Sequence, residues 1–165
     1  MCRGFTPVGP PGRLTRWHSI RHPPALHSDL VLNGNLGELA RMTAETAQFC
    51  RQHGLAEDVE FDLNLVLEEL FVNSLQHGGC QGLDSVVEVR FSLLPDGVRL
   101  EYADRGTPFD PTQAPAAAVA SPLSEQPVGG LGIHLIRQIM RDIEYHRLDG
   151  WNRLRMRRPI PAEGT

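Results

Sequence analysis

The chain has 165 residues, of which 41% are hydrophobic and 22% charged, and its formal net charge is −4. This length supports one domain with a substantial core and excludes two domains of ordinary size, and the mild acidity gives no reason to expect direct nucleic-acid binding. Cys2, Cys50 and Cys80 form no CxxC pair, which favours a reduced protein over a disulfide scaffold or a structural zinc site.

No segment approaches the roughly 18 apolar residues that a membrane helix needs, and the N-terminus lacks an apolar run of signal-peptide length. We therefore expect a cytoplasmic protein that does not contact a membrane. Residues 1–26 mix Gly, Pro, Arg and His without a period, which is typical of an irregular or mobile tail.

The first predicted elements are a short apolar strand over residues 28–32 and a helix over residues 36–53. Asn33 or Asn35 is expected to cap the start of this helix, and Gly54 to end it. The residues expected along its buried face are Leu36, Leu39, Ala40, Ala47 and Phe49.

A second, longer helix is predicted from Asp58 or a neighbour until Gly78 and Gly79 end it. It carries an apolar stripe wide enough to lie on a sheet. The members of this stripe are Leu63, Leu67, Leu70 and Phe71. Glu69 and Asn73 are four residues apart and share the opposite face. Asn is a poor residue for a helix interior, and such local misfits are expected at functional sites.

Residues 86–104 alternate apolar and polar side chains on either side of Pro95-Asp96-Gly97, which predicts an antiparallel hairpin. Periodicity then disappears over about residues 107–128, where Pro, Ala and Ser dominate, and we interpret this segment as a functional lid.

The glycines at 129–132 open a third predicted helix, with Ile133, Ile136 and Met140 on its apolar side. A second hairpin is predicted from residues 143–148 and 151–156, joined at Asp149-Gly150. The element order predicts an α+β fold, a two-layer sandwich in which about three helices cover a mixed, mostly antiparallel sheet. We expect the domain to span residues 27–158, followed by a tail at 159–165.

Three separated motifs suggest chemistry. On the second helix, the Asn73 amide could offer its oxygen to Mg²⁺, and the Glu69 carboxylate one turn earlier could polarise a hydroxyl; alternatively both are merely solvated. At a strand end, Asp104 could accept a hydrogen bond from the exocyclic amine of a purine, and Gly106 would let the backbone approach the ring; alternatively this is an ordinary turn.

The third motif, Gly129-Gly130-Leu131-Gly132, lies at a helix start, where exposed N–H groups favour a phosphate; the alternative is an ordinary glycine-rich loop. It matches neither a P-loop, which needs Lys-Ser or Lys-Thr after the glycines, nor a dinucleotide fingerprint, which needs a βαβ unit.

In order and spacing, the three motifs resemble the N, G1 and G2 boxes of the Bergerat-fold (GHKL, histidine-kinase-like) ATPases, and most closely those of the anti-sigma-factor serine/threonine kinases. EELFVNSLQHG resembles the N box, DRGTPFD the G1 box and GGLGIHLI the G2 box. The ending MRDIEYHRLDGWNRLRM, with its Gly-x-Asn, resembles the closing hairpin of that group. The resemblance covers residues from about 28 to 157.

The resemblance implies that Glu69 is the general base and that Asn73 binds Mg²⁺ that bridges the phosphates. It implies that Asp104 recognises adenine, with Gly106 shaping the pocket. Gly130 and Gly132 would allow the lid and the third helix to close on the phosphates of ATP. The neighbouring Glu68 is given no role, and its helix angle turns it away from Asn73. His77 could line the site, although a lone His there is more often a packing or capping residue.

The implied function is ATP-dependent phosphorylation of an anti-anti-sigma antagonist protein, combined with sequestration of a sigma factor, and these kinases commonly act as homodimers. One alternative is a regulatory module that binds ATP without catalysis, or does not bind it, since residues 107–128 contain no Arg or Lys. A histidine-kinase catalytic domain is a weaker alternative, because the phosphoacceptor helix hairpin is not found in this sequence.

Overall fold

The structure is a computed structural model that describes residues 27–113 and 130–160. The described residues form, in chain order, β1 (His27–Leu32), α1 (Glu38–Gln52), α2 (Glu57–Gln76), β2 (Val87–Leu94), β3 (Gly97–Asp104), α3 (Gly130–Ile139), β4 (Arg141–Leu148) and β5 (Trp151–Pro159). The predicted N-terminal tail, most of the predicted lid and most of the predicted C-terminal tail lie outside these ranges.

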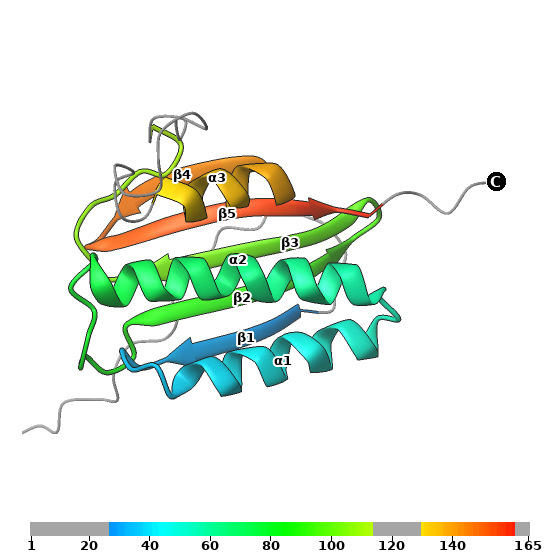
Figure 1. Ribbon diagram of the computed structural model, residues 1–165, viewed down its shortest axis with the longest axis horizontal. Helices are drawn as coiled ribbons and strands as arrows, with labels where there is room; N and C mark the ends of the chain where they lie inside the picture. The colour runs from blue at the N-terminus through cyan, green and yellow to red at the C-terminus, as the bar shows by residue number, and fades with distance from the viewer. Residues whose placement is uncertain (1–26, 114–129, 161–165) are drawn as a thin grey trace, which may run out of the picture.

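The five described strands form one sheet in the order β1-β2-β3-β5-β4, and every neighbouring pair is antiparallel. Figure 1 shows α1, α2 and α3 on one face of this sheet, with α2 between the other two. The predicted α+β two-layer sandwich is therefore confirmed. The sequence predicted a mixed, mostly antiparallel sheet, and all the described strand pairs are antiparallel.

Both predicted hairpins are present, and each has a two-residue turn. Leu94 pairs with Gly97 across the first turn, and Leu148 pairs with Trp151 across the second. In the second turn Asp149 and Gly150 have φ angles of 50° and 80°. Two successive positive φ values are the signature of a type I′ turn, whose twist matches that of the flanking strands.

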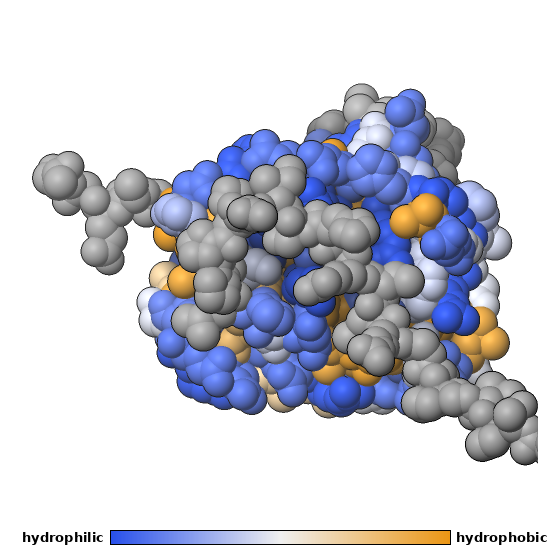
Figure 2. All heavy atoms as spheres, turned by 180° about the vertical axis from the view of Figure 1, so that it is seen from behind, coloured by the Kyte–Doolittle hydropathy of each residue, from blue (hydrophilic) through white to orange (hydrophobic). Residues whose placement is uncertain are grey.

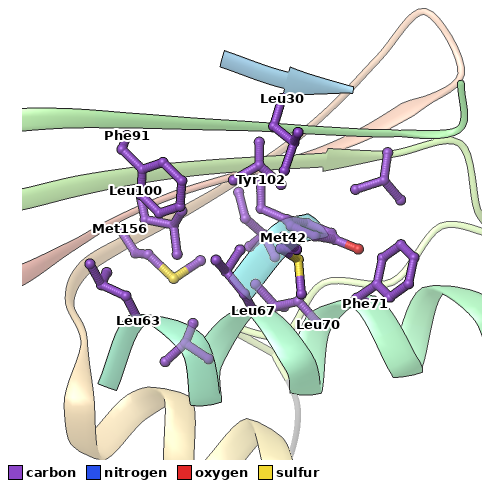
Figure 3. Packing of buried hydrophobic residues seen from close by; sticks show 14 of the residues in the cluster. Leu30, Met42, Leu63, Leu67, Leu70, Phe71, Phe91, Leu100, Tyr102 and Met156 are labelled. Atoms are coloured by element: carbon purple, nitrogen blue, oxygen red, sulfur yellow. The ribbon is translucent and has the colours of Figure 1, made fainter. Parts of the chain in front are cut away.

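The core lies between α2 and the sheet. The apolar stripe predicted for α2 is confirmed, because Leu63, Leu67, Leu70 and Phe71 are all buried. Figure 3 shows these side chains facing those of the sheet. The labelled strand residues in that view are Leu30, Phe91, Leu100, Tyr102 and Met156. The predicted apolar side of α3 is also confirmed, since Ile133, Ile136 and Met140 are buried. The apolar face of α2 packs against the sheet, so the face turned away from the sheet can carry polar residues.

The predicted cap of α1 is wrong. The helix begins at Glu38 after Gly37, and no side chain caps its first turn. Asn33 Oδ1 instead accepts a hydrogen bond of 2.9 Å from the backbone N–H of Ser85, and Asn35 contributes only its carbonyl, which accepts from the Glu38 N–H. The Asn33 side chain is therefore committed to joining the start of α1 to the loop before β2.

The predicted buried face of α1 is correct at Phe49 and partly correct at Leu39, which packs partly buried against the core, but it is wrong at Leu36 and Ala40, which are exposed. The buried residues are Met42, Thr46, Phe49 and Cys50, whereas Leu36 is exposed and precedes the helix. The prediction counted the helical period from Leu36, so the buried stripe that it expected is rotated about the helix axis relative to the observed one. Thr46 can lie in this apolar face because its hydroxyl donates a 2.9 Å hydrogen bond to the carbonyl of Met42.

The other face of the sheet carries paired charges. Figure 2 views the molecule from this side, and most of the coloured residues there are hydrophilic. Arg90 makes two hydrogen bonds with Asp29 on the neighbouring strand, and Arg155 contacts the buried Glu101 at 3.3 Å. Helices thus cover only one face within the described ranges. None of these helices has both the length and the apolar character needed to cross a membrane.

Replacing Leu67 by Ala should lower the free energy of unfolding by roughly 3 kcal/mol, because Leu67 is fully buried between α2 and the sheet and its removal leaves a cavity. Phe61 on the same helix is 65% exposed, so Phe61→Ala should change that free energy by no more than about 0.5 kcal/mol. Urea denaturation of both variants measures the difference. Equal losses would contradict the assigned packing of α2.

Candidate functional site

The three predicted motifs meet on the C-terminal half of α2. A Cβ atom added to Gly132 would lie 2.1 Å from Glu69 Oε2, and one added to Gly106 would lie 2.9 Å from the carbonyl oxygen of Gly78. Between these two points, the Ser74 hydroxyl contacts Asp104 at 3.0 Å. With a rise of 1.5 Å per residue, the contacts at positions 69 and 74 are separated by about 7.5 Å along the helix axis.

Asp104 ends β3 as a buried carboxylate, with only 8% of its surface exposed. Its Oδ1 atom accepts hydrogen bonds from the Gly106 N–H at 2.7 Å and from Asn152 Nδ2 at 2.8 Å. Its Oδ2 atom accepts one from the Ser74 hydroxyl at 3.0 Å. A buried carboxylate is tolerated when it receives several such bonds, because they replace those it would make with water. The sequence-predicted Asp-x-Gly motif is therefore built as a rigid turn around a charged group.

The direction of the hydrogen bonds around Ser74 follows from the chemistry of its neighbours. Tyr102 is fully buried, and this burial, followed by the charge of Asp104, raises the pKa of its hydroxyl well above the usual value, so the hydroxyl keeps its proton. Tyr102 lies 2.8 Å from the Ser74 oxygen and can donate to it. The Ser74 proton has two acceptors in reach, the Leu70 carbonyl at 2.9 Å and the Asp104 carboxylate at 3.0 Å, and the charged carboxylate is the stronger of the two.

Asn152 is a site residue to which sequence analysis assigns no role. It lies at the start of β5 and is buried, and its Nδ2 donates to Asp104 and also to the carbonyl of Thr107 at 2.9 Å. Its Oδ1 accepts from the Tyr145 hydroxyl and from Arg147, each at 2.8 Å. The only sequence signal was the Gly-x-Asn of the closing hairpin, which resembled a family feature but did not reveal a partner 48 residues away in the chain.

Gly106 and the end of α2 are packed backbone against backbone. The Thr107 N–H donates to the Gly78 carbonyl at 2.8 Å, and Arg147 donates to the Gly106 carbonyl at 2.7 Å. An added Cβ at Gly106 would also approach Gly78 Cα to 3.0 Å. A side chain at position 106 would therefore push the turn away from the helix that it is fixed to.

Gly132 brings α3 against the carboxylate of Glu69. Gly130 is the first residue of α3, and Gly132 is two positions into the helix. Because Gly132 has no side chain, the half-buried Glu69 carboxylate can lie directly on its Cα. Glu68, which was given no role, is exposed.

Asn73 and His77 occupy the last turns of α2. Asn73 is half-buried, next to Ser74 and one turn beyond Glu69, and its carbonyl accepts from the N–H groups of His77 and Gly78. His77 is the exposed C-cap residue of α2. This position matches the capping alternative for His77, whose carbonyl accepts a 3.4 Å hydrogen bond from the Thr107 hydroxyl.

These residues fit a magnesium ion that arrives with a nucleotide. Mg²⁺ prefers oxygen ligands, and beside phosphates it takes only one or two of them from protein and keeps several waters. Asn73 offers one such oxygen. Within residues 27–113 and 130–160, no group of three or more His, Cys, Asp or Glu side chains could form an all-protein metal site.

A small apolar cavity of about 220 Å³ lies beside this site. It is lined by residues of α2, α3, β4, β5 and the segment around Pro111, whose carbonyl accepts a 2.6 Å hydrogen bond from Arg137. Sites for drug-sized ligands usually exceed 300 Å³ and contain several convergent polar groups. This cavity is therefore not the candidate binding site itself, although Leu70 and Ile133 in its wall directly follow Glu69 and Gly132.

The buried cysteines are not suited to nucleophilic chemistry. Burial is the largest cause that raises the pKa of both Cys50 and Cys80 to about 11, and Asp104 adds to the effect at Cys80. Both thiols are therefore protonated at neutral pH, where the thiolate is the nucleophilic form. This agrees with the absence of a cysteine motif in the sequence.

Comparison with known proteins adds a family likeness. The family model described as "Histidine kinase-like ATPase domain" matches residues 32–158. Serine/threonine-protein kinase BtrW from Bordetella bronchiseptica is 32% identical over 117 residues, which cover 68% of this chain and 82% of BtrW. Serine-protein kinase RsbW from Bacillus pumilus is 31% identical over 100 residues, which cover 57% of this chain and 61% of that relative. The chain thus spans less than two thirds of RsbW.

A solved structure supports the fold. The crystal structure of the RsbU and RsbW domains of Rv1364c from Mycobacterium tuberculosis matches with a TM-score of 0.59 over 82% of this chain and 33% of that chain. Its sequence identity is 14%, so the match is a likeness of fold.

Gly106→Ala and Gly132→Ala should differ in their effect on stability. At position 106 the new Cβ meets the backbone of Gly78, so we expect a loss of roughly 1–3 kcal/mol in the free energy of unfolding. At position 132 the new Cβ meets only the Glu69 side chain, which can swing away, so the change should stay within about 1 kcal/mol. Urea denaturation measures both values. A large loss for Gly132→Ala alone would show that the contacts are assigned wrongly.

Proposed function

We propose that this chain, which belongs to the histidine kinase-like ATPase family, is an ATP-dependent protein serine/threonine kinase. In this proposal it phosphorylates an anti-anti-sigma antagonist protein and, in another state, sequesters a sigma factor. Relatives at 31–32% identity that are named as serine or serine/threonine-protein kinases support the kinase assignment.

The observation that carries the proposal is the convergence of three separated motifs on one helix. Asp104 lies at Ser74, Gly106 at Gly78 and Gly132 at Glu69. Asp104, which could bind adenine, and Glu69, which could act at the phosphates, therefore lie at different positions along α2. This is the order of parts that a kinase needs, because phosphoryl transfer depends mainly on positioning and charge neutralisation.

Each proposed site residue has one task. Asp104 accepts a hydrogen bond from the adenine amine, and Gly106 shapes the pocket by donating its N–H to the Asp104 carboxylate. Glu69 accepts the proton of the attacking serine hydroxyl, as a general base within reach of its substrate does. Gly130 and Gly132, at the start of α3, leave backbone N–H groups and the positive end of the helix dipole open to phosphate.

Asn73 is the proposed protein ligand of Mg²⁺, through its side-chain oxygen. When bound, the ion supplies charge neutralisation at the phosphates. The protein partners, a homodimeric state and a cytoplasmic location are parts of the same proposal, and the family likeness motivates them.

A regulatory module that binds ATP without transferring phosphate is the second candidate. It is favoured by the composition of residues 107–128, which contain no Arg or Lys that could contact the γ-phosphate. Calorimetry with Mg-ATP and a transfer assay together separate the two functions. Binding without transfer supports the module, and transfer supports the kinase.

Glu69→Gln should reduce phosphoryl transfer at least 100-fold, because a general base typically contributes about 10²–10⁴-fold to the rate. Glu68→Gln is the matched control, since Glu68 precedes it on the same helix but is exposed, and it should retain transfer within about twofold. The assay incubates the full chain with Mg-[γ-³²P]ATP and a purified anti-anti-sigma protein and counts labelled antagonist.

Affinity for Mg-ATP should change little in Glu69→Gln, because the base acts on the acceptor hydroxyl. Calorimetry on the same two variants checks this. Undiminished transfer by Glu69→Gln would remove Glu69 from the chemistry, and equal losses in both variants would indicate a general effect of charge on α2.

A further inference from the structure

We propose that Asn152 is a positioning residue that fixes which oxygen of Asp104 receives the purine amine, and that it thereby sets selectivity for a base with an amino group at C6. This inference rests on the proposed nucleotide-binding function and adds to it a residue from the far end of the chain. It is argued from the hydrogen bonds that surround the Asp104 carboxylate.

The amide of Asn152 has only one orientation that satisfies its neighbours. Tyr145 and Arg147 both donate to its oxygen, and its nitrogen faces the Asp104 carboxylate and the Thr107 carbonyl, which can only accept. Turning the amide over would place its N–H groups against the Arg147 guanidinium, which can only donate, and its oxygen against the Asp104 carboxylate and the Thr107 carbonyl, which can only accept. The Nδ2 group is therefore held as a donor toward Asp104.

This donor completes the coordination of one carboxylate oxygen. Asp104 Oδ1 already accepts from the Gly106 N–H, so the bond from Asn152 uses its second lone pair. Oδ2 accepts one hydrogen bond from a described residue, that of Ser74. Among the described contacts, the acceptor position that remains for a ligand is thus on Oδ2.

A single acceptor position has a chemical consequence. It can receive the N–H of a 6-amino group, whereas a 6-oxo group would bring a second acceptor against the carboxylate. Without Asn152, Oδ1 would regain a free lone pair, and the carboxylate would lose the partner that fixes its rotation. The 6-amino group could then donate to either Oδ1 or Oδ2 of Asp104, and neither position would be well defined.

The experiment compares ATP with purine riboside 5′-triphosphate, which has hydrogen in place of the 6-amino group. Isothermal titration calorimetry with Mg²⁺ measures both dissociation constants for wild type and for Asn152→Ala. We expect wild type to prefer ATP by about tenfold or more, because the hydrogen bond lost is to a charged group. In Asn152→Ala the preference should fall below about threefold, through weaker ATP binding, while affinity for the analogue stays within about twofold.

Two further variants separate positioning from folding. Tyr145→Phe removes only the hydroxyl that donates to Asn152, and it should narrow the preference in the same direction by a smaller factor. If Asn152→Ala does not unfold cooperatively, Tyr145→Phe decides. His146→Ala is the matched control, because His146 lies between the two network residues of β4 but is exposed, and both affinities should be unchanged.

The assignment of Asn152 would be overturned if Asn152→Ala lost affinity equally for ATP and for purine riboside 5′-triphosphate. It would also be overturned if Asn152→Ala and Tyr145→Phe both kept the wild-type preference for ATP. If wild type binds neither nucleotide, the proposed function itself fails, and the inference fails with it. Binding of both nucleotides by wild type without a preference would overturn the inference alone.

Discussion

A carboxylate buried at the end of a central strand imposes the strongest constraint on this structure. Removing an ionised group from water costs several kcal/mol unless other groups replace its hydration. Asp104 therefore requires donors, and they come from α2, from the turn that follows β3 and from β5. Hydrogen bonds to this one carboxylate therefore join Asp104 to Ser74, 30 residues earlier in the chain, and to Asn152, 48 residues later. The same requirement places the polar end of α2, with Asn73 and Ser74, beside the strand end.

The parts of the fold that sequence predicted correctly are those with a strong local period. The alternation over β2 and β3 and the turn residues of both hairpins determine those elements almost independently of the rest of the chain. The apolar stripe of α2 is similarly clear. The α1 helix was predicted less well, because Asn33 bonds to the distant Ser85 and a buried Thr46 replaces an apolar residue in the stripe. These features depend on tertiary partners that local patterns do not contain.

The candidate site divides in the same way. Glu69, Asn73 and Asp104 were visible as polar residues in unusual places, and the glycines gained meaning from a family resemblance. Ser74 and Asn152 were not found, since each is an ordinary polar residue until its partner is known. The structure also changes the interpretation of the glycines. Gly106 and Gly132 are required less for backbone flexibility than for absence of a side chain, because other groups of the protein lie where the Cβ atoms would be.

The register of β5 against β3 places Asn152 directly opposite Asp104. Side chains on a strand alternate between the two faces, so a slip of β5 by one residue would turn Asn152 to the other face and bring Trp151 or Arg153 opposite Asp104. The same slip would turn Leu154 and Met156, which are buried, away from the core. The apolar packing of β5 therefore also preserves the hydrogen bond that Asn152 donates to the buried carboxylate.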